Sequence, residues 1–255
     1  MQKLPVLLAI KHALKAVIHF RGAGIRIGLP WILALAVFSM LDLILFGVVD
    51  FTSADNANIM SIRPTDMIIA ALSMVAFSSI AVNWHRYILL DEVTTSERIF
   101  RLDLPVWKYV GRTLLILFIA IIPLSIVSAV VLAVFSAFSA LLAFPFFAAG
   151  IYIMRASIAL PATALERGDF GISAALQATR GNNLQFAGLL LLDCLIFFVT
   201  VAVLSVSLSI VGNFGLTAVK ISAVLLSIPA NLFLSLFSVS LLSSLYGFFV
   251  EQRKF

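Results

Sequence analysis

Six polar residues that interrupt apolar stretches of the sequence could do chemistry. They are Asn83, His85 and Arg86, in the stretch NWHRYILLDE (83–92), and Asp42, Arg155 and Asp193. A charged side chain at the centre of a bilayer costs on the order of 3 kcal/mol on insertion scales, so such residues usually face a bundle interior or a wet cavity. Together they could form a polar intramembrane cluster that handles protons or binds a polar ligand.

The depth of these residues makes particular pairs geometrically possible. Asp193 and Arg155 lie at comparable depth in two predicted membrane spans, and Asp42 lies past the midplane of its own span. An Asp193–Arg155 or Asp193–Arg86 pair could line a polar path. The alternative, which the sequence favours, is a static ion pair or a protonated, hydrogen-bonded aspartic acid. His85 and Arg86 could equally be an anchor where a helix leaves the membrane, with Arg86 reaching the headgroups.

Prolines inside predicted spans suggest a second kind of site. Pro123, Pro145 and Pro229 interrupt backbone hydrogen bonding, and broken helices border binding sites in many transporters. Pro229 is the most informative because Asn231 adds a polar group beside the kink. We therefore predict a hinge at Pro229 and Asn231, although proline is also simply common in membrane helices.

Signatures of soluble enzymes and metal sites are absent from the sequence. It contains no HExxH, GxSxG or P-loop motif. The three histidines, His12, His19 and His85, are scattered, and Cys194 is the only cysteine. We therefore expect a non-enzymatic protein with no cofactor, no metal site and no intramolecular disulfide. An intramembrane enzyme with few polar residues is the least favoured of the functions considered.

Composition identifies the elements that must position these residues. Hydrophobic residues make up 62% of the chain and charged residues 11%, and the mean hydropathy is +1.15. Soluble domains have roughly 45–50% and 25%, respectively. The apolar stretches reach the roughly 20 residues that a helix needs to cross a hydrocarbon core. The sequence therefore predicts one all-α domain over 1–255, a polytopic helical bundle with short cytoplasmic amphipathic helices.

The hydropathy pattern predicts six transmembrane helices and one interfacial helix. The spans are about 28–49, 66–90, 113–135, 140–163, 184–211 and 223–249, with a turn near Ser136–Ser139 between the third and the fourth. Residues 3–20 form an amphipathic helix, with Lys11, Lys15, His12 and His19 on one arc and Leu7, Ile10, Leu14 and Val17 on another. This helix could lie on an anionic leaflet or pack on the bundle.

The distribution of basic residues supports this topology. With both termini cytoplasmic, fifteen of the seventeen Lys and Arg residues lie on the cytoplasmic side, and only Arg63 and Lys220 lie on the other. The fifteen are Lys3, Lys11, Lys15, Arg21, Arg26, Arg86, Arg98, Arg101, Lys108, Arg112, Arg155, Arg167, Arg180, Arg253 and Lys254. The net charge of +5 therefore reflects the positive-inside bias, and we expect no nucleic-acid partner.

Short motifs indicate repetition and a family resemblance. FRGAGIRIGL (20–29), YVGRTLL (109–115) and TRGNNLQFAGL (179–189) each precede an odd-numbered span, which suggests a threefold repeat of hairpins. The stretches WHRYILLDE, RASIALPATALERG, SAALQATRGN and SLYGFFVEQ resemble bacterial inner-membrane proteins of the YciC-like group. They also resemble the membrane domain of some glycerophosphodiester phosphodiesterases. The resemblance implies six spans in a bacterial inner membrane, but the catalytic phosphodiesterase domain has no counterpart here.

These observations lead to two functional hypotheses. The first is a non-enzymatic inner-membrane protein that binds or organises membrane components, either anionic lipids or a protein partner. The alternative is a small-solute or lipid transporter that uses Asp42, Asp193 and the proline-kinked helices. A transporter requires a water-accessible cavity that reaches one of those acids, whereas an organiser requires only a binding surface.

Overall fold

The computed structural model describes residues 3–46, 63–134, 140–211 and 216–253, and they form an all-α protein. Six of its helices are long and apolar enough to cross a membrane, which confirms the predicted fold class. The predicted turn near Ser136–Ser139, the side chain of Lys220 and residue Lys254 lie outside the described part of the chain.

The described helices differ from the predicted spans mainly at their charged ends. They are α1 (Val6–His19), α2 (Arg21–Phe46), α3 (Pro64–Leu90), α4 (Leu104–Val134), α5 (Ala143–Ala156), α6 (Ala159–Ala164), α7 (Ile172–Ala178), α8 (Asn183–Val211) and α9 (Leu216–Phe249). Helix α2 begins seven residues before the predicted 28 and α4 nine residues before the predicted 113. Both extend beyond the apolar stretch because the residues before it, which include Arg21 and Arg26 in α2 and Lys108 and Arg112 in α4, continue the same helix.

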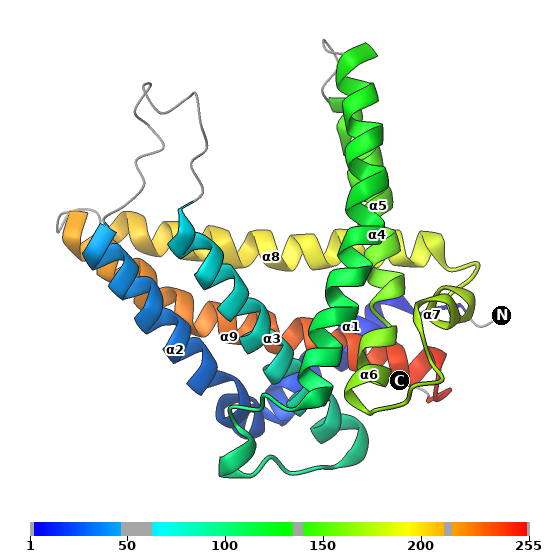
Figure 1. Cartoon of the computed structure of the whole chain (residues 1–255), viewed down its shortest axis with the longest axis horizontal. Helices are drawn as coiled ribbons and strands as arrows, with labels where there is room; N and C mark the ends of the chain where they lie inside the picture. The colour runs from blue at the N-terminus through cyan, green and yellow to red at the C-terminus, as the bar shows by residue number, and fades with distance from the viewer. Residues whose placement is uncertain (1–2, 47–62, 135–139, 212–215, 254–255) are drawn as a thin grey trace.

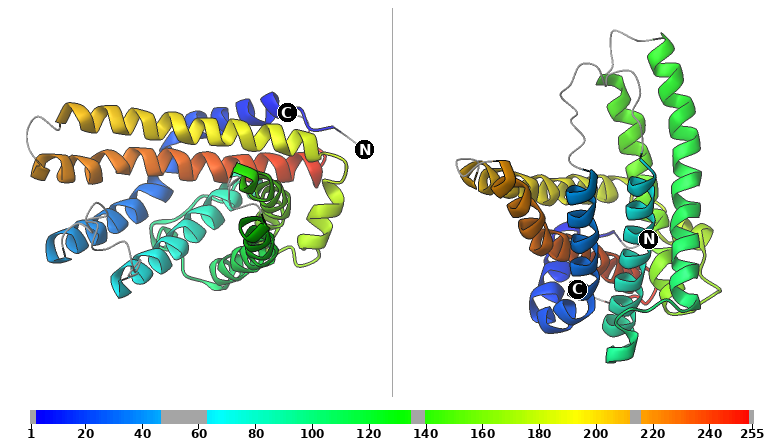
Figure 2. Two further views of the ribbon diagram at one scale, coloured as in Figure 1. Left: turned by 90° about the horizontal axis from the view of Figure 1, so that it is seen from above. Right: turned by 60° about the vertical axis from the view of Figure 1, so that its left-hand side comes forward.

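Three helical hairpins diverge from a common base (Figures 1 and 2). Helices α2 and α3, α4 and α5, and α8 and α9 lie side by side, and each pair points in a different direction. The pairs meet where α1, α6, α7 and the adjoining ends of the long helices pack together. We call this region the hub. The arrangement of three hairpins does not by itself demonstrate a sequence repeat, which stays a prediction.

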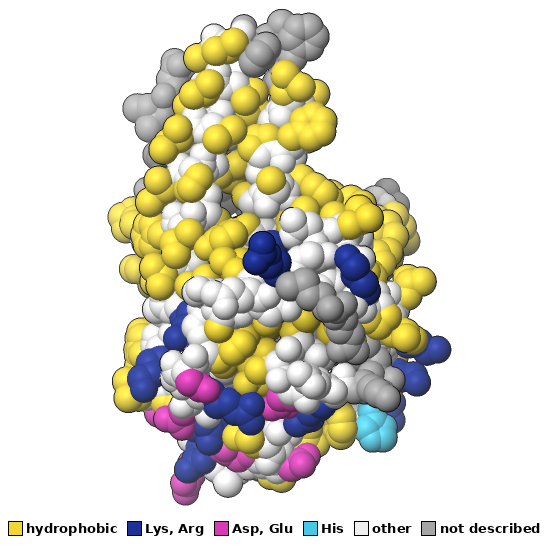
Figure 3. Space-filling view, turned by 90° about the vertical axis from the view of Figure 1, so that its right-hand side faces the viewer, with side chains coloured by type: hydrophobic (Ala, Val, Ile, Leu, Met, Phe, Trp, Pro, Cys, Tyr) yellow, Lys and Arg dark blue, Asp and Glu magenta, His cyan; other side chains and the backbone are white. Residues whose placement is uncertain are grey.

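The hub contains the core of the protein. Its largest fully buried side chains include Trp84, Tyr109, Tyr246, Phe186 and Phe237. Away from the hub the long helices are mostly uncovered by protein: only 6% of the most apolar window of Asn183–Val211 is buried. Apolar side chains cover the projecting α4–α5 hairpin, while charged ones gather toward the hub (Figure 3). Such a surface requires acyl chains around the hairpins.

Helix α1 packs on the bundle, as one of the two predicted alternatives requires. Ala9 and Ala13 are fully buried, and Ile10 and Val17 nearly so, where α1 contacts α9. Leu7 was predicted on the same apolar arc, but 73% of it is exposed. The buried stripe is therefore narrower than the apolar arc, because two alanines allow α1 to approach α9 closely.

Local signals fix both ends of α3, the helix that carries NWHRYILLDE. At its start, Pro64 occupies the first turn and the Asp66 carboxylate accepts a hydrogen bond from the Arg63 backbone N–H at 3.0 Å. At its end, Asp91 adopts a left-handed conformation with φ 55°, and its N–H bonds back to the Arg86 carbonyl. The helix thus ends at the edge of the hub, with Asn83, Trp84 and His85 buried one to two turns before its end.

Gly24 provides a test of how the first hairpin docks on the third. A Cβ atom at Gly24 would lie 2.6 Å from Leu236 Cδ1 and 3.3 Å from the Trp84 ring, whereas one at Gly22 meets nothing within 4 Å. We predict that Gly24→Leu lowers the free energy of unfolding by about 1–3 kcal/mol through overpacking. Gly22→Leu should be neutral or slightly stabilising because leucine forms helix better than glycine. Thermal unfolding of both variants in detergent measures this difference; equal stabilities would contradict the docking.

Candidate functional site

His85 faces the interior of the hub and joins all three hairpins. Its Nδ1 lies 2.8 Å from Ser243 Oγ on α9, and its Nε2 lies 3.4 Å from the Tyr109 hydroxyl on α4. The imidazole and the phenol are fully buried, and Ser243 is 3% exposed. Three polar side chains in contact therefore connect α3, α4 and α9 in a buried region, where water does not compete for their hydrogen bonds.

The donors of this chain can be assigned in only one consistent order. Ser243 Oγ donates to the Val239 carbonyl at 3.0 Å, so it accepts the hydrogen bond from His85 Nδ1–H. The Nε2 atom is then the acceptor for the Tyr109 hydroxyl. In this order the imidazole takes no proton from Ser243, so the serine is not an activated nucleophile. The geometry supports a structural clamp and gives no hydrolase chemistry.

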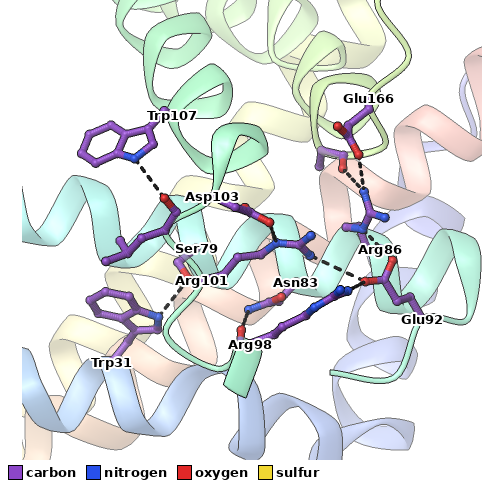
Figure 4. A network of polar contacts seen from close by, with 12 residues as sticks. Trp31, Ser79, Asn83, Arg86, Glu92, Arg98, Arg101, Asp103, Trp107 and Glu166 are labelled. Atoms are coloured by element: carbon purple, nitrogen blue, oxygen red, sulfur yellow. Dashed lines mark hydrogen bonds and ion pairs between the residues drawn. The ribbon is translucent and has the colours of Figure 1, made fainter. Parts of the chain in front are cut away.

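Arg86, the next residue along α3, points away from His85 and binds the charged loops. Its Nε donates to Glu92 at 2.7 Å, and one Nη donates to the Ala164 carbonyl and to Glu166, both at 3.2 Å. Figure 4 shows Glu92 between Arg86 and two further arginines of the loop. Arg86 thus connects the loop after α3 to the end of α6, and these hydrogen bonds all go to other residues of the protein.

The loop between α3 and α4 is held by side-chain bonds to its backbone carbonyls (Figure 4). The donors and acceptors are Asn83 Nδ2 to Arg98 at 3.0 Å, Trp31 Nε1 to Ile99 at 3.1 Å, and Trp107 Nε1 to Leu102 at 3.1 Å. Asn83 is 2% exposed. The helix-exit interpretation of NWHRYILLDE is therefore incomplete, because Asn83 and His85 are buried anchors within the protein.

The predicted Asp193–Arg155 and Asp193–Arg86 pairs are wrong: among the described residues, neither forms. Arg155 instead donates to Thr179 Oγ1 at 2.9 Å, Asn183 Oδ1 at 2.7 Å and the Leu176 carbonyl at 2.8 Å. These acceptors cluster where α7 ends and α8 begins, and they satisfy the guanidinium without a carboxylate. Asp193 lies partly exposed on α8.

Asp42 lies far along the first hairpin and belongs to a separate ion-pair group. Arg63 Nη2 contacts Asp42 at 2.9 Å and Asp66 at 3.1 Å, which joins the outer part of α2 to the start of α3. The hydrogen bond to Asp66, opposed by partial burial and reinforced by the charge of Asp42, raises the pKa of Arg63. The six predicted residues thus fall into several groups and do not form one intramembrane cluster.

The predicted hinge residues lie on a continuous helix. Helix α9 runs through Pro229, and Asn231 Nδ2 donates to the Ser227 carbonyl at 2.9 Å. Asn231 also lines a cavity of about 320 Å³ between α2, α3 and α9. Neither Asp42 nor Asp193 lines that cavity, so the polar path expected of the transporter alternative is not assembled here.

A second, basic cavity was not predicted from the sequence. It has a volume of about 360 Å³ and lies between the start of α4 and the end of α6. Its lining comprises Lys108, Gly111, Arg112, Leu115, Thr163, Glu166, Arg167 and Gly168. We call it the basic pocket. The i, i+4 spacing of Lys108 and Arg112, which places both on one helix face, was the available signal.

The cations of the basic pocket differ in their partners. Arg167 binds Glu251 and the Tyr246 hydroxyl, both at 2.9 Å. Arg112 donates only to the backbone carbonyls of Ala159 and Phe170, at 3.4 and 3.1 Å. Within the described chain, neither Arg112 nor Lys108 has a carboxylate partner. Glu166 also lines the pocket but pairs with Arg86, so cations outnumber carboxylates in the lining.

Neither metal chemistry nor relatedness narrows the function further. The described residues contain no group of three His, Cys, Asp or Glu side chains that could hold a metal ion. No protein-family model, curated protein or solved structure matches the chain. The geometry of the hub and its cavities is therefore the basis for the function.

The hydrogen bonds of His85 predict that Tyr109→Phe changes the stability in opposite directions in the presence and in the absence of His85. His85→Leu leaves the buried Tyr109 hydroxyl without an acceptor and should cost about 1–3 kcal/mol. In that background Tyr109→Phe should be stabilising because it removes the orphaned hydroxyl, whereas in the wild type it should be neutral or destabilising. Denaturant unfolding of the four proteins in mixed micelles measures the cycle. Additive effects would show that the bond between Tyr109 and His85 is not formed.

The contacts of Arg155 and Asp193 predict that substituting Arg155 destabilises the protein, whereas substituting Asp193 does not. Arg155→Gln removes bonds to three acceptors around the α7–α8 turn and should destabilise the protein by about 1–3 kcal/mol. Asp193→Asn, which also removes one charge, should alter stability by less than about 0.5 kcal/mol because no ion pair is lost. Thermal unfolding compares them, and a large loss in Asp193→Asn would contradict its assignment.

Proposed function

We propose that this protein is a non-enzymatic, multi-pass protein of a bacterial inner membrane that binds anionic phospholipid headgroups in the basic pocket. The observation that carries this proposal is the pair Lys108 and Arg112, cations without a carboxylate partner, at a cavity of about 360 Å³. An anionic group supplied from outside the chain would compensate them. Cavities of this size accommodate small ligands and headgroups.

The surroundings of the basic pocket favour a lipid over a soluble anion. Leu115 lines the pocket, and beyond it α4 exposes Leu114 and Phe118 on its outer surface. A phosphate bound by Lys108 and Arg112 would therefore have its acyl chains beside an apolar helix face. Each cation near an anionic leaflet contributes about 1 kcal/mol to such binding. Trp107, 52% exposed, adds an aromatic side chain suited to the headgroup level.

The orientation proposed here places the hub at the cytoplasmic face of the membrane, with both termini on that side. Supporting it, nearly all basic residues belong to the hub or its loops, whereas the Arg63 ion-pair group lies at the opposite end of the first hairpin. The resemblance to YciC-like inner-membrane proteins agrees with this orientation. The loops that carry the cations are short, which is the condition under which positive charge determines topology.

The transporter alternative and a protein partner are less well supported. Transport through Asp42 and Asp193 needs a shared path, but Asp42 binds Arg63 on one hairpin and Asp193 lies on another. A protein partner on the charged surface would meet loops whose arginines are already paired internally. A headgroup ligand needs only Lys108 and Arg112, which have no carboxylate partner in the described structure.

Lys108→Gln tests the proposed function. We predict that it reduces the retention of phosphatidylglycerol relative to phosphatidylcholine by about fivefold, since it removes one cation of roughly 1 kcal/mol. The stability should not change because, among the described residues, the Lys108 side chain forms no ion pair. Native mass spectrometry of protein released from nanodiscs that contain both lipids measures the ratio directly.

Arg180→Gln is the matched control for this experiment. It removes the same charge from an exposed residue of the hub that does not line the basic pocket. The control should keep the wild-type lipid ratio. Equal losses in both variants would mean that lipid selection depends on net charge alone, and unchanged ratios in both would refute the basic pocket as a headgroup site.

A further inference from the structure

A smaller, partly open cavity lies elsewhere in the hub, between α1 and the inner ends of α3 and α9. Its volume is about 100 Å³, and its polar lining consists of His12, Ser240, Ser243, Ser244 and Arg253. It shares no residue with the basic pocket. A cavity of this size holds a group larger than one water, which needs roughly 10–15 Å³, but not a whole lipid.

The hydroxyl of Ser240 is the feature of this cavity that needs a ligand. Ser240 is 1% exposed, and its Oγ has no hydrogen-bond partner among the described residues. The neighbouring hydroxyls are engaged: Ser243 donates to Val239, and Ser244 donates to the Ser240 carbonyl while contacting His12 Nδ1 at 2.8 Å. Buried hydroxyls are nearly always satisfied, so an external acceptor for Ser240 is the simplest completion.

Arg253 brings a cation to the mouth of the same cavity. The chain reverses at Gln252, which has φ 53°, and the Arg253 stem folds back to within 3.5 Å of a Cβ position on Gly247. The Arg253 Nε lies 2.7 Å from a Glu251 carboxylate oxygen. Among the described residues the guanidinium has no other ion-pair partner, and its planar set of N–H donors suits oxyanions.

The C-terminal end of α9 repels an anion in this cavity less strongly than a helix terminus with unpaired carbonyl groups would. The Tyr246 carbonyl accepts from the N–H groups of Val250 and Glu251, and the Gly247 carbonyl accepts from the Arg253 N–H at 2.9 Å. These bonds satisfy carbonyls that would otherwise repel an anion. Burial, and then the nearby charge of Lys15, lower the pKa of His12, which disfavours its charged form.

We propose that this cavity binds a small oxyanion, a phosphate group held by the Ser240 hydroxyl and the Arg253 guanidinium. The site does not depend on the proposed headgroup function of the basic pocket. The phosphate could be free inorganic phosphate or the monoester of a lipid whose chains stay outside the cavity. Because α1 forms one wall and α9 the opposite wall, bound phosphate would hold the N-terminal helix to the last span.

Titration of sodium phosphate into the full-length protein in maltoside, at constant ionic strength, tests the first source. Isothermal calorimetry should show binding that Arg253→Gln weakens by about tenfold, the effect expected for one charged hydrogen bond. Ser240→Ala, which removes only the unpartnered hydroxyl and suits a helix, should weaken it about threefold to tenfold. Arg180→Gln, which removes the same charge outside the cavity, should bind as the wild type does.

Nanodiscs of phosphatidylcholine that contain phosphatidic acid test the second source. If free phosphate does not bind, both cavity variants should still lose retained phosphatidic acid in native mass spectrometry, and Arg180→Gln should not. Loss with either probe supports the proposal and identifies the source. Binding that depends on Arg253 but not on Ser240 would indicate surface attraction and overturn it, as would cavity variants that match the wild type with both probes.

Discussion

The hydrogen bonds of His85 are the interaction on which the rest of the hub depends. Inside a membrane, helices gain little from hydrophobic association because lipid tails are as apolar as leucine. Polar bonds and close packing must then decide which helices meet. His85 on α3 bonds Ser243 on α9 and faces Tyr109 on α4, so one buried imidazole contacts all three hairpins. Close approach at Gly24 and at the alanines of α1 completes the same junction.

The position of His85 beside Arg86 couples this buried junction to the charged surface. On a helix, consecutive side chains point about 100° apart, so one residue can face the core while the next faces the loops. Arg86 accordingly reaches Glu92 and Glu166, which organise the loop after α3 and the end of α6. Helix α6 in turn forms one wall of the basic pocket. The proposed lipid site is therefore positioned by bonds that begin in the core.

Whether the sequence predicts a feature depends on what physically determines that feature. The six spans were predictable because length and apolar composition alone determine whether a helix can cross a bilayer. The partners of Arg155 were not, because the turn that supplies Thr179 and Asn183 exists only once α7 has folded back. Depth suggested the Asp193–Arg155 pair, but depth says nothing about rotation around the helix axis. The inward direction of His85 depends on that same rotation.

The basic residues of the hub separate into two groups that sequence counting treats alike. One group makes short contacts to acceptors within the chain, and these contacts hold loops and turns in place. It comprises Arg86, Arg98, Arg101 and Arg155. Lys108 and Arg112 have no carboxylate partner in the described structure, and Arg253 pairs with Glu251 alone among the described acids. A positive-inside bias requires only that these cations be present on one side. It does not require that Lys108 and Arg112 line one pocket, where a ligand with negative charge would pair with both.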